Sequence, residues 1–186
     1  PRGPGRLDRE VLSSFSLVVE ATDNGSPVKS TLSSVNITVT DANDNNPVFQ
    51  RSSYSFGIPE TSIAGTLIVS VLATDADLPN NVNSQIVYSI SGGSSIIEIN
   101  SGNGSLFLSQ SVCIGQQGLQ NPTIITVIAE DQGTGANSAS VQVDVTFTGR
   151  NDNAPQFALD NLQLTINESI PIGTSIANLD ATDADC

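Results

Sequence analysis

The sequence predicts an all-β protein that folds as a β-sandwich of immunoglobulin-like architecture, and three observations lead to this prediction. Apolar residues alternate with polar residues over many short segments, a pattern typical of strands with one buried face. Clusters of Gly, Asn, Ser and Pro separate these segments, and no segment shows a sustained helical stripe with caps. About seven short strands in roughly a hundred residues is the pattern expected of such a sandwich.

The runs with the clearest alternation define the longer strands, which lie at residues 15–22, 34–40, 67–73, 125–129 and 141–145. In each run every second residue is apolar, so that one face can be buried while the other meets water. The residues predicted to form these apolar faces are Phe15, Leu17, Val19, Ala21, Val35, Ile37, Val39, Leu67, Val69, Val71, Ala73, Ile125, Val127, Ala129, Val141, Val143 and Val145. Shorter strands are predicted at 54–58, 86–90, 95–99 and 105–109.

The sequence contains an internal repeat with an offset of 108 positions (181 − 73 = 108). "ATDAD" at 73–77 returns unchanged at 181–185, and "DANDNNP" at 41–47 returns as "GRNDNAP" at 149–155. Agreement of several motifs on one offset, without gaps, indicates repeated structural units. Further residues matched at this offset are Asp23 with Asp131, Asn43 with Asn151, Asn45 with Asn153, Pro47 with Pro155, Phe49 with Phe157, and Glu60 with Glu168. The repeat predicts the end of one unit at 1–46, one whole unit at 47–154, and the start of a third at 155–186.

Charge and composition exclude several classes of function. The chain carries 19 acidic and 6 basic residues and no His, with a formal net charge of −13, which argues against binding nucleic acid through a basic surface. Without His there is no Ser-His or Cys-His pair for nucleophilic catalysis, so we expect no enzymatic activity. Cys113 and Cys186 are isolated, so a zinc or copper site would lack its usual ligands. No run of about 18 apolar residues is present, so no segment of this sequence is predicted to span a membrane, and any membrane attachment is expected outside it.

Oxygen-bearing side chains crowd at strand ends and at the junctions between the predicted units. The stretch 41–47 alone holds two Asp, three Asn and a Pro. By itself it could form an Asx-rich turn, but "LDRE" at 7–10 and "DAD" at 75–77 add acids at other strand ends. Two like charges about 4 Å apart repel by about 4 kcal/mol at an effective dielectric near 20, so such a cluster needs counter-ions. Ca²⁺ suits it, because calcium takes about six to eight oxygens from carboxylates, amides and carbonyls.

The motifs "LDRE", "ATDNGSP", "DANDNNP", "IPETSIAG", "ATDAD" and "NVNSQIVYSI", in this pattern, resemble extracellular cadherin repeats, and the resemblance covers essentially the whole chain. It implies a seven-stranded Greek-key sandwich in tandem copies, with typically three calcium ions at each junction between repeats. It further implies calcium-dependent cell–cell adhesion by the extracellular part of a longer, protocadherin-like plasma-membrane protein. The expected partners are other cadherin molecules, in homophilic or heterophilic pairs.

The resemblance assigns calcium ligands at the first junction residue by residue. Carried over onto this sequence, they are Asp8, Glu10, Asp41, the Ala42 carbonyl, Asn43, Asp44, the Asn45 carbonyl, Asp75, Asp77, the Asn83 carbonyl and Asp131. Arg9 carries no ligand oxygen and is interpreted as a charged neighbour.

The second junction departs from this pattern. At the repeat offset, Asp8 and Glu10 fall on Gln116 and Gly118, and Asp41 falls on Gly149, so three carboxylates are missing. The residues that remain are Glu60, Asn151, Asp152, Asn153, Asp183 and Asp185. We predict that this junction binds fewer ions, or binds them more weakly, and bends more.

Two further features leave alternatives open. Sequons begin at Asn24, Asn36, Asn103 and Asn167, of which Asn36 on a polar strand face and Asn103 in a turn are the better glycosylation candidates.

Instead of an adhesion module, the chain could be a non-adhesive calcium-binding spacer, a carbohydrate-binding sandwich, or part of a signalling receptor. Sugar binding is disfavoured because there is no Trp and the only tyrosines are Tyr54 and Tyr88.

Overall fold

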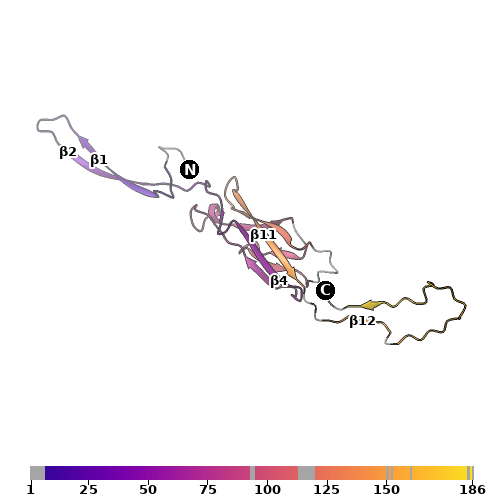
Figure 1. Ribbon diagram of the computed structural model, residues 1–186. Coiled ribbons are helices and arrows are strands. Elements are labelled where there is room, and N and C mark those ends of the chain that lie inside the picture. Colours follow the sequence, from indigo (N-terminus) through magenta and orange to yellow (C-terminus); the bar gives the residue numbers. More distant parts are fainter. Residues whose placement is uncertain are drawn as a thin grey trace.

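The computed structural model of the chain describes residues 7–92, 95–112, 120–149, 151, 153–159, 161–183 and 185. Figure 1 shows an elongated arrangement of three parts that follow one another along the chain. A two-stranded ribbon lies toward the N-terminus, a β-sandwich lies in the middle, and a second ribbon-like part lies toward the C-terminus. Among the described residues, no helix has the length and apolar character needed to cross a membrane.

The N-terminal ribbon consists of β1 (Ser14–Thr22) and β2 (Ser30–Thr38), which pair in antiparallel fashion with Phe15 opposite Ile37. Both predicted strands are present, and β2 begins four residues earlier than its apolar pattern indicates. The apolar face is exposed, however, with Leu17 at 48% and Val19 at 51%. A single ribbon has one layer, and burial of its apolar face requires a second layer packed on it.

The central sandwich has the predicted strand content, in sheets of four and three strands. The larger sheet has the order β4 (Ser53–Pro59), β11 (Ser138–Thr148), β10 (Thr123–Glu130) and β7 (Val87–Ser91). The smaller sheet has the order β5 (Leu67–Ser70), β9 (Ser105–Leu108) and β8 (Ile97–Ile99). β11 pairs with β4 in parallel and with β10 in antiparallel fashion, so the first and last long strands are neighbours. This alternation between sheets is the Greek-key arrangement of immunoglobulin-like sandwiches.

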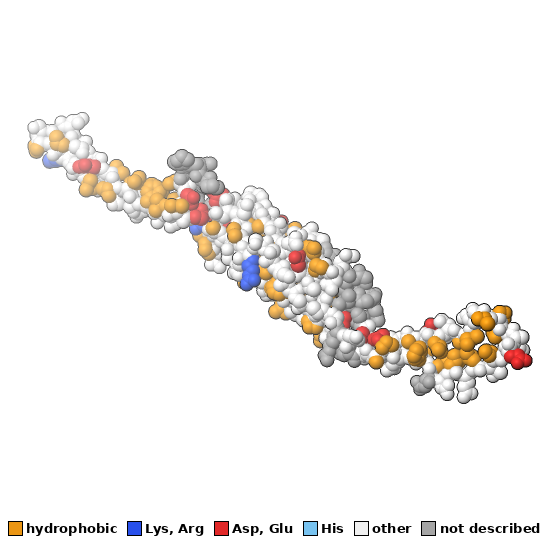
Figure 2. All heavy atoms as spheres, viewed as in Figure 1, with side chains coloured by type: hydrophobic (Ala, Val, Ile, Leu, Met, Phe, Trp, Pro, Cys, Tyr) orange, Lys and Arg blue, Asp and Glu red, His pale blue; other side chains and the backbone are white. Residues whose placement is uncertain are grey.

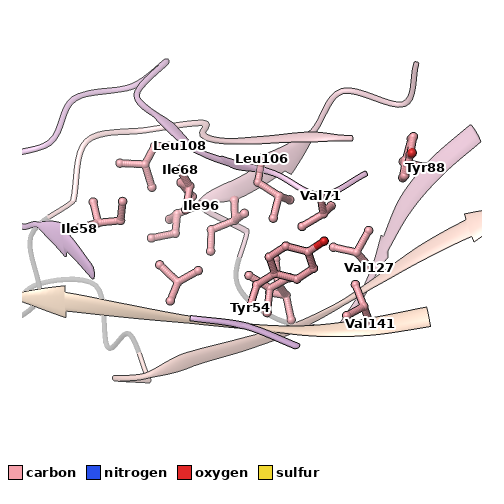
Figure 3. Close-up of a cluster of buried hydrophobic side chains, with 14 of the residues drawn as sticks. Tyr54, Ile58, Ile68, Val71, Tyr88, Ile96, Leu106, Leu108, Val127 and Val141 are labelled. Atoms are coloured by element: carbon pink, nitrogen blue, oxygen red, sulfur yellow. The ribbon is translucent and has the colours of Figure 1, made fainter. Parts of the chain in front are cut away.

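The core lies between the two sheets, where side chains from both meet (Figure 3). The inward positions predicted for β10 and β11 are confirmed. The side chains of Ile125, Val127, Ala129, Val141, Val143 and Val145 are all at most 5% exposed. Each fully buried Val, Leu, Ile or Phe side chain stabilises the fold by about 1.5–3 kcal/mol. The buried side chains of these two long strands therefore attach the larger sheet to the core.

The prediction that Leu67 belongs to the core is wrong. Leu67 is 60% exposed, whereas its neighbour Ile68 is 9% exposed. The pairing of β5 with β9 shifts register between Leu67 and Val69, which marks a β-bulge. A bulge adds one residue to one strand and reverses the side-chain alternation there. Consequently Val71 keeps its predicted inward position, at 0% exposure, while Leu67 turns to solvent.

A short strand pair begins directly after each linker, and the two pairs repeat at the offset found in the sequence. β3 (Val48–Phe49) pairs with β6 (Ala73–Thr74), placing Phe49 opposite Ala73. β12 (Gln156–Phe157) pairs with β13 (Ala181–Thr182), placing Phe157 opposite Ala181. The two pairs differ by 108 positions in every residue (157 − 49 = 108). The repeated motifs therefore form repeated structure.

Candidate metal centre

The first junction comprises the linker 41–47 and the residues that contact it. Linker residues meet side chains from "LDRE", from the segment after β6, and from the turn after β10. Figure 2 shows acidic side chains gathering where the N-terminal ribbon joins the sandwich, and again at the opposite end of the sandwich. Residues far apart in the sequence thus lie together at the two ends of the sandwich, next to the linkers.

Asp41 is at the centre of the first junction. Its Oδ1 accepts hydrogen bonds from Arg9 Nε at 2.6 Å and from the Leu78 amide at 3.2 Å. Its Oδ2 accepts one from Asn83 Nδ2 at 2.9 Å. Burial alone would raise the pKa of the Asp41 carboxyl, but these hydrogen bonds and the Arg9 charge outweigh it and lower the pKa below its usual value. The Asp41 side chain is therefore held as a carboxylate.

Glu10, Asp41 and Asp77 form a close group of three carboxylates. One oxygen from each lies within 4.8 Å of the others. Their exposure decreases from Glu10, which faces solvent, to Asp77, which is 1% exposed. Three negative charges this close repel one another, and the repulsion is least screened at the buried Asp77. A cation between them relieves that repulsion.

Asp77 is held in place by the linker and by its own turn. Asn45 donates to it from Nδ2 at 2.7 Å and from the backbone amide at 3.5 Å. The Asp77 amide in turn donates to Asp75 Oδ1 at 2.9 Å. Burial raises the pKa of Asp75, the hydrogen bond from Asp77 partly offsets this, and the charges of Asp77, Asp131 and Asp41 raise it further. Asp75 thus experiences the accumulated negative charge of the junction.

Asp131 connects the linker to the turn after β10. It is 0% exposed and accepts from the Gly133 amide at 2.9 Å, the Asn137 amide at 3.0 Å and Asn43 Nδ2 at 2.9 Å. Gly133 has no room for a side chain, because a Cβ there would lie 2.5 Å from Asn43 Cγ and 2.5 Å from Asn83 Oδ1. The glycine therefore permits the close approach of linker and turn.

The second junction, centred on 149–155, repeats part of this construction. Asn153 donates to Asp185 Oδ1 from Nδ2 at 2.6 Å and from its amide at 3.0 Å, and the Asp185 amide donates to Asp183 Oδ1 at 2.8 Å. These contacts match those of Asn45, Asp77 and Asp75. Asn151 is exposed, and Asp152, Gln116 and Gly118 lie outside the described residues.

Gly149 occupies the position that Asp41 holds in the first junction. A Cβ at Gly149 would lie 3.4 Å from Glu60 Oε2, an ordinary contact distance. Glu60 is 5% exposed, and its amide donates to the Thr148 carbonyl at 3.1 Å. A carboxylate at position 149 would therefore stand beside Glu60, and the glycine supplies none.

Comparison with known proteins decides the family. Residues 54–148 match the family model of the cadherin domain. The chain belongs to the cadherin family. Cadherin domains are non-enzymatic modules, in agreement with the expectation from the sequence.

The relatives of this cadherin chain are long proteins. It is 35% identical over 184 residues to human Protocadherin Fat 4 and 34% identical over 183 residues to mouse Cadherin EGF LAG seven-pass G-type receptor 1. These matches cover 97% and 96% of this chain but only 4% and 6% of the relatives. The chain therefore spans a small fraction of the length of the curated relatives it matches.

Solved structures of cadherin extracellular domains have the same fold. A structure of PcdhgB3 EC1-4 matches with a TM-score of 0.77 and 29% identity, covering 97% of this chain and 42% of that chain. Mouse Cadherin-23 EC22-24 matches with a TM-score of 0.73 and 33% identity, covering 96% of this chain and 56% of that chain. The predicted tandem Greek-key fold is thus confirmed.

The residues of the first junction fit a hard divalent cation. All candidate ligands are oxygens, as calcium requires. Two side-chain oxygens, Asn43 Oδ1 and Asp75 Oδ2, are buried and accept no hydrogen bond within the described part of the chain. A buried acceptor without a partner is costly, by about 1–3 kcal/mol. A cation bound beside either oxygen would supply its missing partner.

Other predicted ligands lie at the edge of the close carboxylate group. Asp8 Oδ1 accepts from the Val11 amide at 3.2 Å, and exposed Asp44 accepts from Asn45 Nδ2 at 3.3 Å. The Ala42 carbonyl accepts from the Asp44 amide at 2.9 Å. The segment of Asn83 forms a 3₁₀ turn, Val82–Ser84 (η1). The structure therefore brings Glu10, Asp41 and Asp77 together and keeps Asp8 and Asp44 outside that group.

The sequence did not indicate the role of Asn137, and it did not indicate that Arg9 contacts Asp41 directly. Asn137 Nδ2 donates to the Asn45 carbonyl at 3.0 Å and to the Asn43 carbonyl at 3.4 Å, which fastens the linker to the turn. The position matched to Asn137 by the repeat is Lys29, so the repeat gave no signal for it. Arg9 contacts Asp41 directly, and the signal that could have found it is its place between two acids in "LDRE".

The remaining candidates concern sugar binding and glycosylation. Tyr54 and Tyr88 are 7% and 5% exposed, so neither offers a platform for stacking a sugar ring. Asn36 is exposed and its Oδ1 accepts from Ser16 Oγ at 2.6 Å. Asn103 is exposed, and its Oδ1 accepts from the Ser105 amide at 3.0 Å in the turn between β8 and β9. Both glycosylation candidates are thus accessible on the surface.

Proposed function

We propose that this cadherin chain acts in calcium-dependent cell–cell adhesion, with calcium ions at the first junction fixing the orientation of successive repeats in an extracellular rod. The observation that carries the proposal is the meeting of Glu10, Asp41 and Asp77, one residue from each side of the junction and one from the linker itself. Support also comes from the relatives, which include protocadherins, and from structural matches titled as extracellular cadherin domains.

The repeat boundaries proposed for this role follow the linkers. Residues 1–46 end one repeat, 47–154 form a whole repeat, and 155–186 begin a third. The match of the cadherin family to 54–148 and the spacing of the paired strands β3–β6 and β12–β13 support this division. Each linker then lies between two sandwiches, where an ion can bind to both.

When bound, calcium would accept oxygen ligands from both repeats and neutralise their mutual repulsion. Glu10 and Asp8 would hold it from the preceding repeat, and Asp75, Asp77, Asp131 and the Asn83 carbonyl from the following one. The linker would contribute Asp41, Asn43, Asp44 and the carbonyls of Ala42 and Asn45. The chain's own residues orient this set: Asn45 holds Asp77, Asn43 holds Asp131, and Asn137 holds the linker backbone.

The mechanical consequence follows from the charge. Each close pair of carboxylates repels by about 4 kcal/mol at an effective dielectric near 20. Sites in extracellular modules bind calcium at about 10⁻⁴ to 10⁻³ M, which suits a plasma-membrane protein exposed to extracellular calcium. The ion holds the joint, and the rod presents distal surfaces to other cadherin molecules, in homophilic or heterophilic pairs. One structural match is titled a protocadherin cis-dimer, which supports a partner of the same family.

The second junction is proposed to bind less calcium and to bend more. Its sequence lacks three of the acids that the first junction has, and Gly149 supplies no carboxylate beside Glu60, whereas Asp41 stands at the equivalent place. Asp183 and Asp185 remain in the arrangement seen at Asp75 and Asp77. We therefore propose a rigid joint followed by a looser one.

Limited proteolysis with and without a calcium chelator tests this function. In calcium, cleavage within 41–47 should be slow, and chelation should speed it by about tenfold or more, because the repelling acids loosen the linker. The double variant Glu10→Gln, Asp77→Asn lacks two of the three carboxylates of the close group, so its cleavage should differ little between calcium and chelator. Glu98→Gln is the matched control, because Glu98 is an exposed acid on β8 outside the junction. Equal cleavage of the unaltered chain in both conditions would contradict the proposal.

A further inference from the structure

We propose that Arg9 is a built-in competitor of calcium at the first junction, so that its guanidinium sets the calcium concentration at which the joint becomes rigid. This inference rests on the proposed calcium site and concerns what else binds its acidic residues. Arg9 is the basic residue that contacts the close carboxylate group within the described part of the chain.

The guanidinium contacts both repeats and the linker. Arg9 Nε donates to Asp41 Oδ1 at 2.6 Å, and Nη2 contacts Glu10 Oε1 at 2.5 Å. Nη2 also donates to the Ala76 carbonyl at 3.2 Å, which lies between the two acids of "DAD" in the following repeat. The Arg9 and Asp41 side chains are 14% and 7% exposed. Such partly buried, charge-assisted contacts are stronger than those of freely exposed pairs.

These contacts occupy acceptor positions that an ion would use. A carboxylate offers about four lone-pair positions. On Asp41, Oδ1 already accepts from Arg9 and Leu78, and Oδ2 accepts from Asn83. Glu10, the other carboxylate that Arg9 contacts, belongs to the same close group. A calcium ion bound between Glu10 and Asp41 and a guanidinium bound to both therefore exclude each other by charge and by space.

Competition gives Arg9 two opposite effects. It lowers the apparent affinity for calcium, because the ion must displace a cation that is tethered to the chain. It also ties the joint together across Asp41 and Ala76 when calcium is scarce, because its contacts join both repeats. The position matched to Arg9 at the repeat offset is Gln117, so the sequence supplies no second guanidinium there.

Calcium titration by calorimetry on the unaltered protein and on variants tests the competition. Arg9→Gln should bind calcium about three- to tenfold more tightly, and should be cleaved faster within 41–47 in chelator. Arg9→Lys keeps the charge but loses the forked geometry and should fall between the two. Arg51→Gln is the control for net charge, because the Arg51 guanidinium lies 5.9 Å from the Tyr54 ring centroid, outside the junction.

The outcomes distinguish failure of the competition by Arg9 from failure of the proposed calcium-binding function. Calcium binding by the unaltered protein, with tighter binding by Arg9→Gln and little change in Arg51→Gln, supports the competition. If the unaltered protein binds calcium but Arg9→Gln binds equally or more weakly, Arg9 is not a competitor while the calcium joint stands. If the unaltered protein binds no calcium, the proposed function fails and this inference fails with it. Should Arg9→Gln not fold, Arg9→Lys distinguishes the same three outcomes.

Discussion

Replacing Asp131 by Ala should destabilise the whole repeat by about 3 kcal/mol. The change leaves three donors without their acceptor, namely the Gly133 and Asn137 amides and Asn43 Nδ2. Each unsatisfied donor in a buried position costs about 1–3 kcal/mol, and Asp131 is 0% exposed. Chemical denaturation in chelator measures this loss without any contribution from calcium. In calcium the loss should be larger, because the variant would also lack a ligand.

The repeat supplies the matched control for this variant. Asp23 lies at the equivalent position and accepts from the Gly25 amide at 3.1 Å and the Lys29 amide at 2.9 Å, but it is exposed. These hydrogen bonds lower the pKa of Asp23, as expected for a carboxylate in such a turn. Asp23→Ala should therefore destabilise the chain less than Asp131→Ala does. Comparable losses for both would show that the turn, rather than the buried contact with the linker, supplies the stability.

Exchanging the residues at positions 41 and 149 should weaken calcium binding at the first junction and strengthen it at the second. Asp41→Gly removes the central carboxylate and should weaken calcium binding at the first junction by about tenfold or more. Gly149→Asp should add a carboxylate beside Glu60, since the Cβ has room there at 3.4 Å and the backbone lies outside the left-handed region. The second junction should then bind calcium more tightly.

The Gly149→Asp variant carries its own internal check. Without calcium the new acid repels Glu60, so the thermal midpoint in chelator should fall; with saturating calcium it should rise above that of the unaltered protein. Gly149→Asn has a similar size without the charge and should show no such reversal. A midpoint that falls in both conditions would contradict the idea that a missing carboxylate limits calcium binding at this junction.

Much of this fold could be predicted because the alternation indicates which side chains are buried and the repeat indicates which segments form equivalent structure. Alternation placed Val127 and Val143 in the core, where both are 0% exposed. The repeat offset matched Phe49 with Phe157, and the structure pairs each with the equivalent partner strand. Both signals depend on local pattern and on chain spacing, which sequence displays directly.

What the sequence did not predict depends on local geometry that alternation does not encode. The bulge in β5 turned Leu67 outward, because a single extra residue reverses the side-chain alternation. Asn137 reaches the linker carbonyls only after the β10–β11 turn has folded against the linker. Arg9 was interpreted only as a charged neighbour, because its direct contact with Asp41 joins residues 32 positions apart. Such contacts become visible only in three dimensions.

One repeated plan should therefore yield two different joints in this protein. A crystal structure of the protein grown with calcium decides the matter, with the ions located at each junction by anomalous difference density. We expect ions bound among Glu10, Asp41 and Asp77, with fewer ions at the junction of Asn153, Asp183 and Asp185. An equal number of well-ordered ions at both junctions, or none at the first, would refute the difference between the joints.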